Sequence, residues 1–270
     1  MNTLYDALPD TDWARYATVY DLIAAHNPAY HDLMRRFHDI AATWMPAPGA
    51  KIVDLGAGSG NFSLALAALY PDCTVMHVDG NPEMNAIAAE KAAARGLGNV
   101  VIRTSDIDAF HLEPGSVAAV TAIHALYAFP DPRGVVRRLA DWLEPGGHVL
   151  ACDPGRVLDT GEWARYIFGA TARRHGLLRA MRLYARAMAG LRQNRHIARR
   201  QAAGSYWLHS LAEFRAEFRA AGLEVTTAYV TYRGCSDLVV ARKPLPVIAA
   251  GDPYHAAAER WVSAVAPVPI

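Results

Sequence analysis

Three glycines at alternate positions stand between an apolar run and a segment rich in alanine and leucine. They are Gly56, Gly58 and Gly60, in the stretch Lys51-Ile-Val-Asp-Leu-Gly-Ala-Gly-Ser-Gly-Asn-Phe. Glycines at such a turn let the backbone bend tightly and approach a ligand more closely than any Cβ would permit. The dinucleotide-binding pattern Gly-x-Gly-x-x-Gly would place its third glycine at position 61, which is Asn61. The loop therefore departs from the dinucleotide-binding type.

Carboxylates accompany this loop at the ends of successive apolar runs. Asp54 stands two residues before Gly56, and Asp79 follows the run Cys73-Thr-Val-Met-His-Val, 23 residues after Gly56. A carboxylate near this position accepts both ribose hydroxyls in α/β nucleotide-binding folds. A third acid, Asp106, ends the run that begins at Asn99. The three acids and the loop together predict a nucleoside site at one edge of a parallel sheet.

With the glycine loop and the acids in this order and spacing, the chain resembles the class I S-adenosylmethionine (SAM)-dependent methyltransferases. Residues 117–132 and 143–150 are similar to the family's fourth strand with its loop and to the turn into its fifth strand. The resemblance covers about residues 50–153 and resumes at 214–225. It implies a transferase that binds SAM and releases S-adenosylhomocysteine.

Apolar runs alternate with helical segments through the middle of the chain. Strands are expected near 51–55, 74–78, 99–103, 117–123 and 147–152. This alternation predicts a doubly wound, parallel α/β sheet. The resemblance implies the Rossmann-like methyltransferase sheet of seven strands, with the last strand antiparallel. We expect five segments: an N-terminal helical lid (1–48), a SAM-binding core (49–155), an arginine-rich helical insert or cap (156–205), the C-terminal part of the core (206–243) and a tail (244–270).

The resemblance also implies which residues contact the cofactor. The three glycines should line its methionine portion, and Asp79 should bind the ribose. Met84 (or Asn81) should lie at the adenine edge, and Asp106 with Ile107 at the adenine amine. The implied cofactor residues are Asp54, Gly56, Gly58, Gly60, Asp79, Met84, Asp106, Ile107 and, from the lid, Tyr20.

SAM carries its methyl group on a sulfonium, so the leaving group is already activated. The enzyme has mainly to hold the acceptor in line and exclude water, and a base is needed only if the acceptor must lose a proton early. His124, at the end of the fourth expected strand, is the candidate base or orienting group, and Tyr127 the second catalytic candidate. The open alternative for His124 is a histidine that bonds only the local backbone. Tyr16 is a candidate for substrate binding, against the alternative of an ordinary half-buried aromatic residue.

The insert is strongly basic. Between residues 156 and 200 there are eleven arginines against Asp159 and Glu162, a net +9 in a chain whose total is +1. One interpretation is a solvated face on a lid or on a helix that forms a homodimer. The other is a cap that presents guanidinium groups to an anionic acceptor, with Arg199 as the candidate. Apolar residues from Leu177 to Leu191, at steps of four and three, predict one helix with an apolar stripe.

Three functions are compatible with these observations. The first is methylation of a small molecule at oxygen, nitrogen or carbon, as in biosynthesis and secondary metabolism. The second follows from a similarity in layout to the carboxy-SAM synthases, in which Arg199 would hold the carboxylate of a modified cofactor. The third is an RNA-directed methyltransferase that uses the basic insert. The near-neutral total charge and the presence of only three lysines argue against a nucleic-acid partner.

Composition limits the remaining classes. Hydrophobic residues make up 52% of the 270, yet no apolar run reaches the roughly 18 residues of a membrane span. Acidic residues near the start argue against a secretory signal. The three separated cysteines predict buried reduced thiols rather than disulfides or a metal site. We therefore expect a cytoplasmic enzyme without a metal and without a membrane partner.

Overall fold

The computed structural model describes residues 11–246, so the first ten residues and most of the expected tail lie outside the description. Seven strands form one sheet in the order β3-β2-β1-β4-β5-β7-β6. The strands are β1 (Lys51–Leu55), β2 (Thr74–Asp79), β3 (Val100–Thr104), β4 (Val117–Ile123), β5 (Leu143–Pro154), β6 (Glu224–Thr231) and β7 (Ser236–Arg242). Neighbours from β1 to β5 pair parallel, and β7 runs antiparallel to both β5 and β6. The predicted doubly wound sheet with an antiparallel last strand is confirmed.

Both faces of the central strands of the sheet are buried. The helices are α1 (Trp13–Ala24), α2 (Pro28–Ala41), α3 (Asn61–Leu69), α4 (Pro82–Ala94), α5 (Pro132–Trp142), α6 (Thr160–His175), α7 (Leu177–Arg186), α8 (Met188–Ala202) and α9 (Leu211–Ala220). Successive residues of a strand point to opposite faces. Accordingly, Ile52 joins an apolar cluster with α2 and α3, and its neighbour Val53 joins another with α5 and α9. Apolar burial on both faces explains the continuous apolar runs of the sequence.

The helices that flank the site begin at signals that are legible in the sequence. Asn27, Asn81 and Asp131 each accept a hydrogen bond from a backbone N–H of the following turn. Each is followed by a proline, whose fixed φ and missing N–H suit the first position of a helix. These caps set the start of α2, α4 and α5 at the end of the sheet where the strands terminate.

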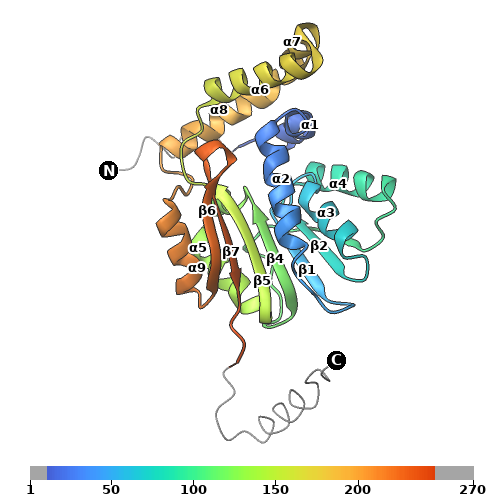
Figure 1. The fold of residues 1–270 in the computed structure, drawn as a ribbon, viewed down its shortest axis with the longest axis vertical. Helices are drawn as coiled ribbons and strands as arrows, with labels where there is room; N and C mark the ends of the chain where they lie inside the picture. The colour runs from blue at the N-terminus through green and yellow to red at the C-terminus, as the bar shows by residue number, and fades with distance from the viewer. Residues whose placement is uncertain (1–10, 247–270) are drawn as a thin grey trace, which may run out of the picture.

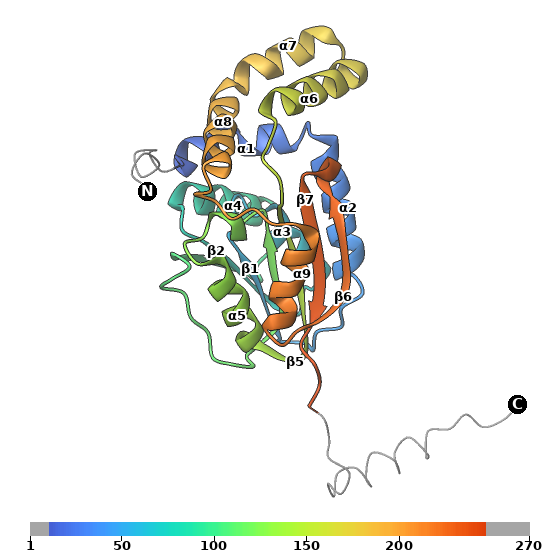
Figure 2. The same ribbon diagram turned by 90° about the vertical axis from the view of Figure 1, so that its left-hand side faces the viewer.

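The expected N-terminal lid divides into two parts. In α2, Leu33 and Phe37 are fully buried against Ile52 and Phe62, so this helix belongs to the core. Only α1 crosses the carboxyl ends of the strands, where it lies between the sheet and the helices α6–α8 (Figures 1 and 2). We call α6–α8 the cap.

The cap differs from the single striped helix that the sequence predicts. The chain breaks at Ala187, so that Leu177 and Met181 lie on α7 while Leu191 lies on α8. The apolar residues keep their helical spacing across the break. Such spacing indicates helix but does not reveal where one helix ends and the next begins. In α8, a Cβ at Gly190 would lie 2.4 Å from Cδ1 of Ile23 and 2.9 Å from Cγ2 of Val19. This glycine therefore lets the cap lie directly against α1.

We expect Gly190→Val to lower the free energy of unfolding by about 1–3 kcal/mol, because the added methyl groups overlap Val19 and Ile23. The matched control is Gly169→Val in α6, where the nearest atom to a Cβ is a flexible Arg173 nitrogen at 3.5 Å. That variant should change stability by less than about 0.5 kcal/mol. Denaturant unfolding measures both, and equal effects would show that α8 does not pack on α1 as described.

Candidate active site

A cavity of about 700 Å³ opens at the carboxyl ends of the strands, beneath α1. Among its lining residues are eight of the nine that the resemblance assigned to the cofactor, and the exception is Gly60. His124 and Tyr16 also line it, whereas Tyr127 and Arg199 do not. The structure therefore brings together the loop, the three acids and one end of the lid around a single cavity.

The three glycines of the loop have different tasks. All have positive φ, with values of 59°, 55° and 82° in chain order. A Cβ at Gly56 would lie 2.5 Å from Cβ of Ala125, and one at Gly60 would lie 2.9 Å from Cβ of Ala88. These two glycines are needed for packing between elements. A Cβ at Gly58 would meet nothing closer than Sδ of Met84 at 4.0 Å, so this position opens directly onto the cavity.

The acids also differ in their surroundings. Asp79 accepts hydrogen bonds from the backbone N–H groups of Gly58 and Asn81, each at 2.8 Å, and so joins the loop to the end of β2. Asp54 is buried and accepts hydroxyl hydrogen bonds from Ser63 and Thr121, both at 2.6 Å. Burial raises the pKa of the Asp54 carboxyl above its usual value, against the opposing effect of these hydroxyl donors.

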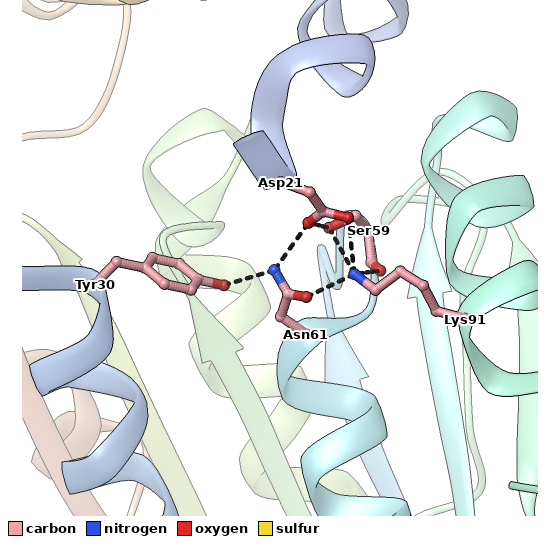
Figure 3. Close-up of polar contacts among 5 residues, drawn as sticks. All are labelled: Asp21, Tyr30, Ser59, Asn61 and Lys91. Atoms are coloured by element: carbon pink, nitrogen blue, oxygen red, sulfur yellow. Dashed lines mark hydrogen bonds and ion pairs between the residues drawn. The ribbon is translucent and has the colours of Figure 1, made fainter. Parts of the chain in front are cut away.

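A hydrogen-bond network at the loop was not anticipated from the sequence (Figure 3). The ammonium of Lys91, on α4, donates to Asp21 Oδ2 at 2.9 Å, to Asn61 Oδ1 at 2.6 Å and to the Ser59 carbonyl at 2.8 Å. Asp21, on α1, also accepts from the Ser59 hydroxyl at 2.6 Å and from Asn61 at 3.0 Å. Asn61 donates in turn to the hydroxyl of Tyr30. This Lys91 network fastens the lid helix to the glycine loop.

A smaller compartment of about 150 Å³ adjoins the first beneath the cap. The two share five wall residues: Trp13, Tyr16, Tyr20, Tyr30 and His124. The remaining wall of the smaller compartment includes Tyr127, Trp163 and Tyr232. Aromatic rings therefore form a large part of this wall, beside polar side chains that include Asn194 and Gln201.

His124 stands where the two spaces meet, and its backbone is unusual. Its φ is +53°, a left-handed conformation that residues other than glycine seldom adopt. Its Nε2 lies 3.0 Å from the hydroxyl of Ser236, and its ring meets that of Tyr232 edge-on at 4.6 Å. The side chain thus contacts residues at the β6–β7 turn rather than the local backbone. Burial lowers the pKa of His124 to about 4, so the ring is neutral at neutral pH.

The arginine of the insert that reaches the site is different from the one that the sequence suggested. Arg199 is exposed on α8 and lines neither space. Arg156 lines the smaller compartment and pairs with the fully buried Asp237 at 2.6 Å. Arg199 precedes the return to the core along the chain, but this does not bring its side chain to the site. The start of the insert, however, follows β5 directly, and this places Arg156 at the end of the sheet.

Several wall residues lacked any local sequence signal. Asn27 donates to the hydroxyl of Tyr232 at 2.8 Å, and Trp163 stacks on the Tyr232 ring at 4.9 Å. Ser236 bonds His124 from the first residue of β7. These contacts join the lid, the cap and the last hairpin across long sequence separations. No motif of one segment predicts them.

Sequence comparison with known proteins points to the same kind of domain. Residues 52–147 match the family model described as a methyltransferase domain. Residues 52–147 are therefore a domain of the methyltransferase family. The chain is similar to nocamycin O-methyltransferase of Saccharothrix syringae, with 34% identity over 152 residues, which are 56% of this chain and 52% of that protein. It is also similar to the ubiquinone biosynthesis O-methyltransferase of Xanthomonas campestris, with 34% identity over 113 residues, 42% of this chain and 46% of that protein. The chain spans about half the length of these curated relatives.

Solved structures share the fold of the chain. The cyclase SpnF superposes with a TM-score of 0.58 and 15% identity, over 86% of this chain and 94% of SpnF. At this identity the likeness shows the fold alone. Because one fold can host different reactions, the reaction has to be argued from the site.

The low pKa of His124 predicts a pH-dependent stability. Unfolded histidine takes up a proton below about pH 6.5, whereas folded His124 does so only near pH 4. Protonation therefore does not affect the free energy of unfolding above about pH 6.5. As the pH falls towards 4, the unfolded state gains protons first, and the free energy of unfolding falls by up to about 3 kcal/mol. Asparagine adopts the left-handed backbone more readily than most residues, and the His124→Asn variant has no ring to protonate at this position. The stability difference between wild type and variant should shrink from pH 7 to pH 4, and a constant difference would contradict the burial of the ring.

Proposed function

We propose that this methyltransferase transfers the methyl group of SAM to an oxygen of a neutral small molecule. The observation that carries the proposal is the pair of adjoining spaces that share His124. One space has the loop and acids suited to a nucleoside, and the other is small and is lined by aromatic and polar side chains. The two relatives described above are both O-methyltransferases, which supports oxygen as the acceptor atom.

The first space fits SAM by its shape and by its donor and acceptor groups. Gly58 provides a cradle that any Cβ would narrow. Each oxygen of Asp79 accepts one backbone N–H and retains a lone pair for a ribose hydroxyl. Asp106 and Ile107, which line the same cavity, would hold the adenine. When bound, SAM supplies a methyl group on a sulfonium, which needs no further activation.

In the second space we assign His124 an orienting role. A neutral imidazole accepts a hydrogen bond from a hydroxyl, and a pKa near 4 is poorly matched to removing a hydroxyl proton at neutral pH. Ser236 and Tyr232 hold the ring. Tyr16 and Tyr127 complete the wall, and burial raises the pKa of both phenols, so both stay protonated. Catalysis would then rest on alignment and exclusion of water.

The charge of the insert does not favour an anionic acceptor. Arg156 is the insert arginine on the wall, and Asp237 already neutralises it at 2.6 Å. The alternative of cofactor modification is also weakened, because Arg199 is exposed and lines neither space, so it cannot hold a carboxylate there. A neutral acceptor with a hydroxyl group fits the wall better.

We expect the protein to move label from methyl-labelled SAM into members of a panel of phenols and other small hydroxy compounds. Asp79→Ala should weaken SAM binding by roughly tenfold to a hundredfold, because hydrogen bonds to a charged group contribute about 1.5–3 kcal/mol. The matched control is Asp72→Ala, at an exposed site in the loop before β2. Thermal unfolding checks that both variants fold.

Two results would contradict the proposal. One is wild-type protein that binds neither SAM nor S-adenosylhomocysteine in calorimetry. The other is label that enters only RNA, when ribosomal RNA is supplied alongside the panel.

A further inference from the structure

Helix α7 lies at the far tip of the cap, with α6 and α8 leading to it from the core (Figures 1 and 2). Its apolar side chains are unusually exposed: Leu177 by 60%, Leu178 by 72%, Met181 by 55% and Tyr184 by 39%. Large exposed apolar residues that cluster on one short helix mark a surface that binds something. We call these four side chains the tip patch.

Arginines border the tip patch. Arg179, Arg182 and Arg186 follow one another at steps of three and four, so they share the neighbouring side of α7, and all three are exposed. The third side of the helix, with Ala180 and Leu183, is buried against the rest of the cap. Helix α7 thus has an anchored side, an exposed apolar side and an exposed cationic side.

The charge around the patch has one sign. Residues 163–212 contain ten arginines and no aspartate or glutamate. A second copy of the chain that presented the same surface would bring arginine against arginine, which disfavours a symmetric dimer through α7. The partner must therefore be anionic, and it must also accept aliphatic side chains.

We propose that α7 docks on the surface of an anionic lipid bilayer. Leucine and methionine would enter the boundary between head groups and acyl chains, while the arginines contact lipid phosphates, as in helices that lie in the plane of an interface. RNA would satisfy the arginines but would offer little to the exposed aliphatic side chains. This proposal departs from the expectation of no membrane partner, which rests on the lack of a spanning segment. Within residues 11–246 no helix is long and apolar enough to cross a bilayer, but a helix that lies on the surface needs no such length.

The position of α7 relative to the site agrees with this assignment. Together with α6 and α8 it encloses an apolar crevice of about 50 Å³, whose walls include Phe168, Leu183 and Leu191. The crevice shares Ile23, Leu158 and Trp163 with the smaller compartment beside His124. The surface that would face the lipid is therefore connected to the aromatic compartment by apolar side chains.

Vesicle flotation with the full chain tests the proposal. Vesicles of phosphatidylcholine that contain phosphatidylglycerol at a mole fraction of about 0.3 should bind the wild type, and vesicles of pure phosphatidylcholine should bind it weakly. Arg179→Gln combined with Arg182→Gln should weaken binding about thirtyfold, because each arginine near an anionic surface contributes about fivefold. Leu178→Glu should weaken it at least tenfold. Met45→Glu, at an exposed methionine in the loop before β1, should leave binding unchanged.

Three outcomes would overturn the proposal. The first is wild-type protein that does not float with the anionic vesicles at low ionic strength. The second is equal binding by wild type and Leu178→Glu, because the tip patch would then have no role. The third is a protein that does not bind the vesicles and instead either binds bulk tRNA or forms a dimer, seen in light scattering, that Leu178→Glu abolishes.

Discussion

The ammonium of Lys91 holds the cofactor side of this molecule together. The Lys91 side chain is only 21% exposed, and its ammonium donates to oxygens of the lid helix, the glycine loop and the start of α3. A cation removed from water to this degree needs partners, and removing it leaves Asp21 without its charged partner. The position of α1 over the cavity therefore depends on a network of five polar side chains as well as on apolar burial.

His124 has a comparable role in the smaller compartment, where the acceptor would bind. The left-handed turn at the end of β4 carries the ring to the boundary of the two spaces, where Ser236 and Tyr232 hold it. Strained backbone of this kind persists only where the surroundings enforce it. The cap and the last hairpin provide those surroundings, which explains why segments that look peripheral in the sequence shape the acceptor compartment.

The sequence predicted the parts of this protein that short segments encode. Gly58 and Asp79 stand in fixed register with their strands, so their meeting at one cavity followed from strand order. Lys91 and Tyr232 gave no such signal, because their partners lie tens to hundreds of residues away. The arginine count of the insert favours a residue such as Arg199 but does not specify where its side chain points, and Arg199 is exposed on α8. The break between α7 and α8 was missed for a similar reason, since a helical period continues through it.

The central claim is that the cavity under α1 is a SAM site closed by the Lys91 network. Calorimetric titration with S-adenosylhomocysteine tests it most directly, using wild type, Lys91→Met, Asp21→Asn, the double variant and Lys51→Met as an exposed control. We predict saturable binding by wild type and control, about tenfold weaker binding by each single variant, and a double variant little worse than either single, since partners in one network are not additive. Absence of binding by the wild type, or unchanged affinity in Lys91→Met, would contradict the account.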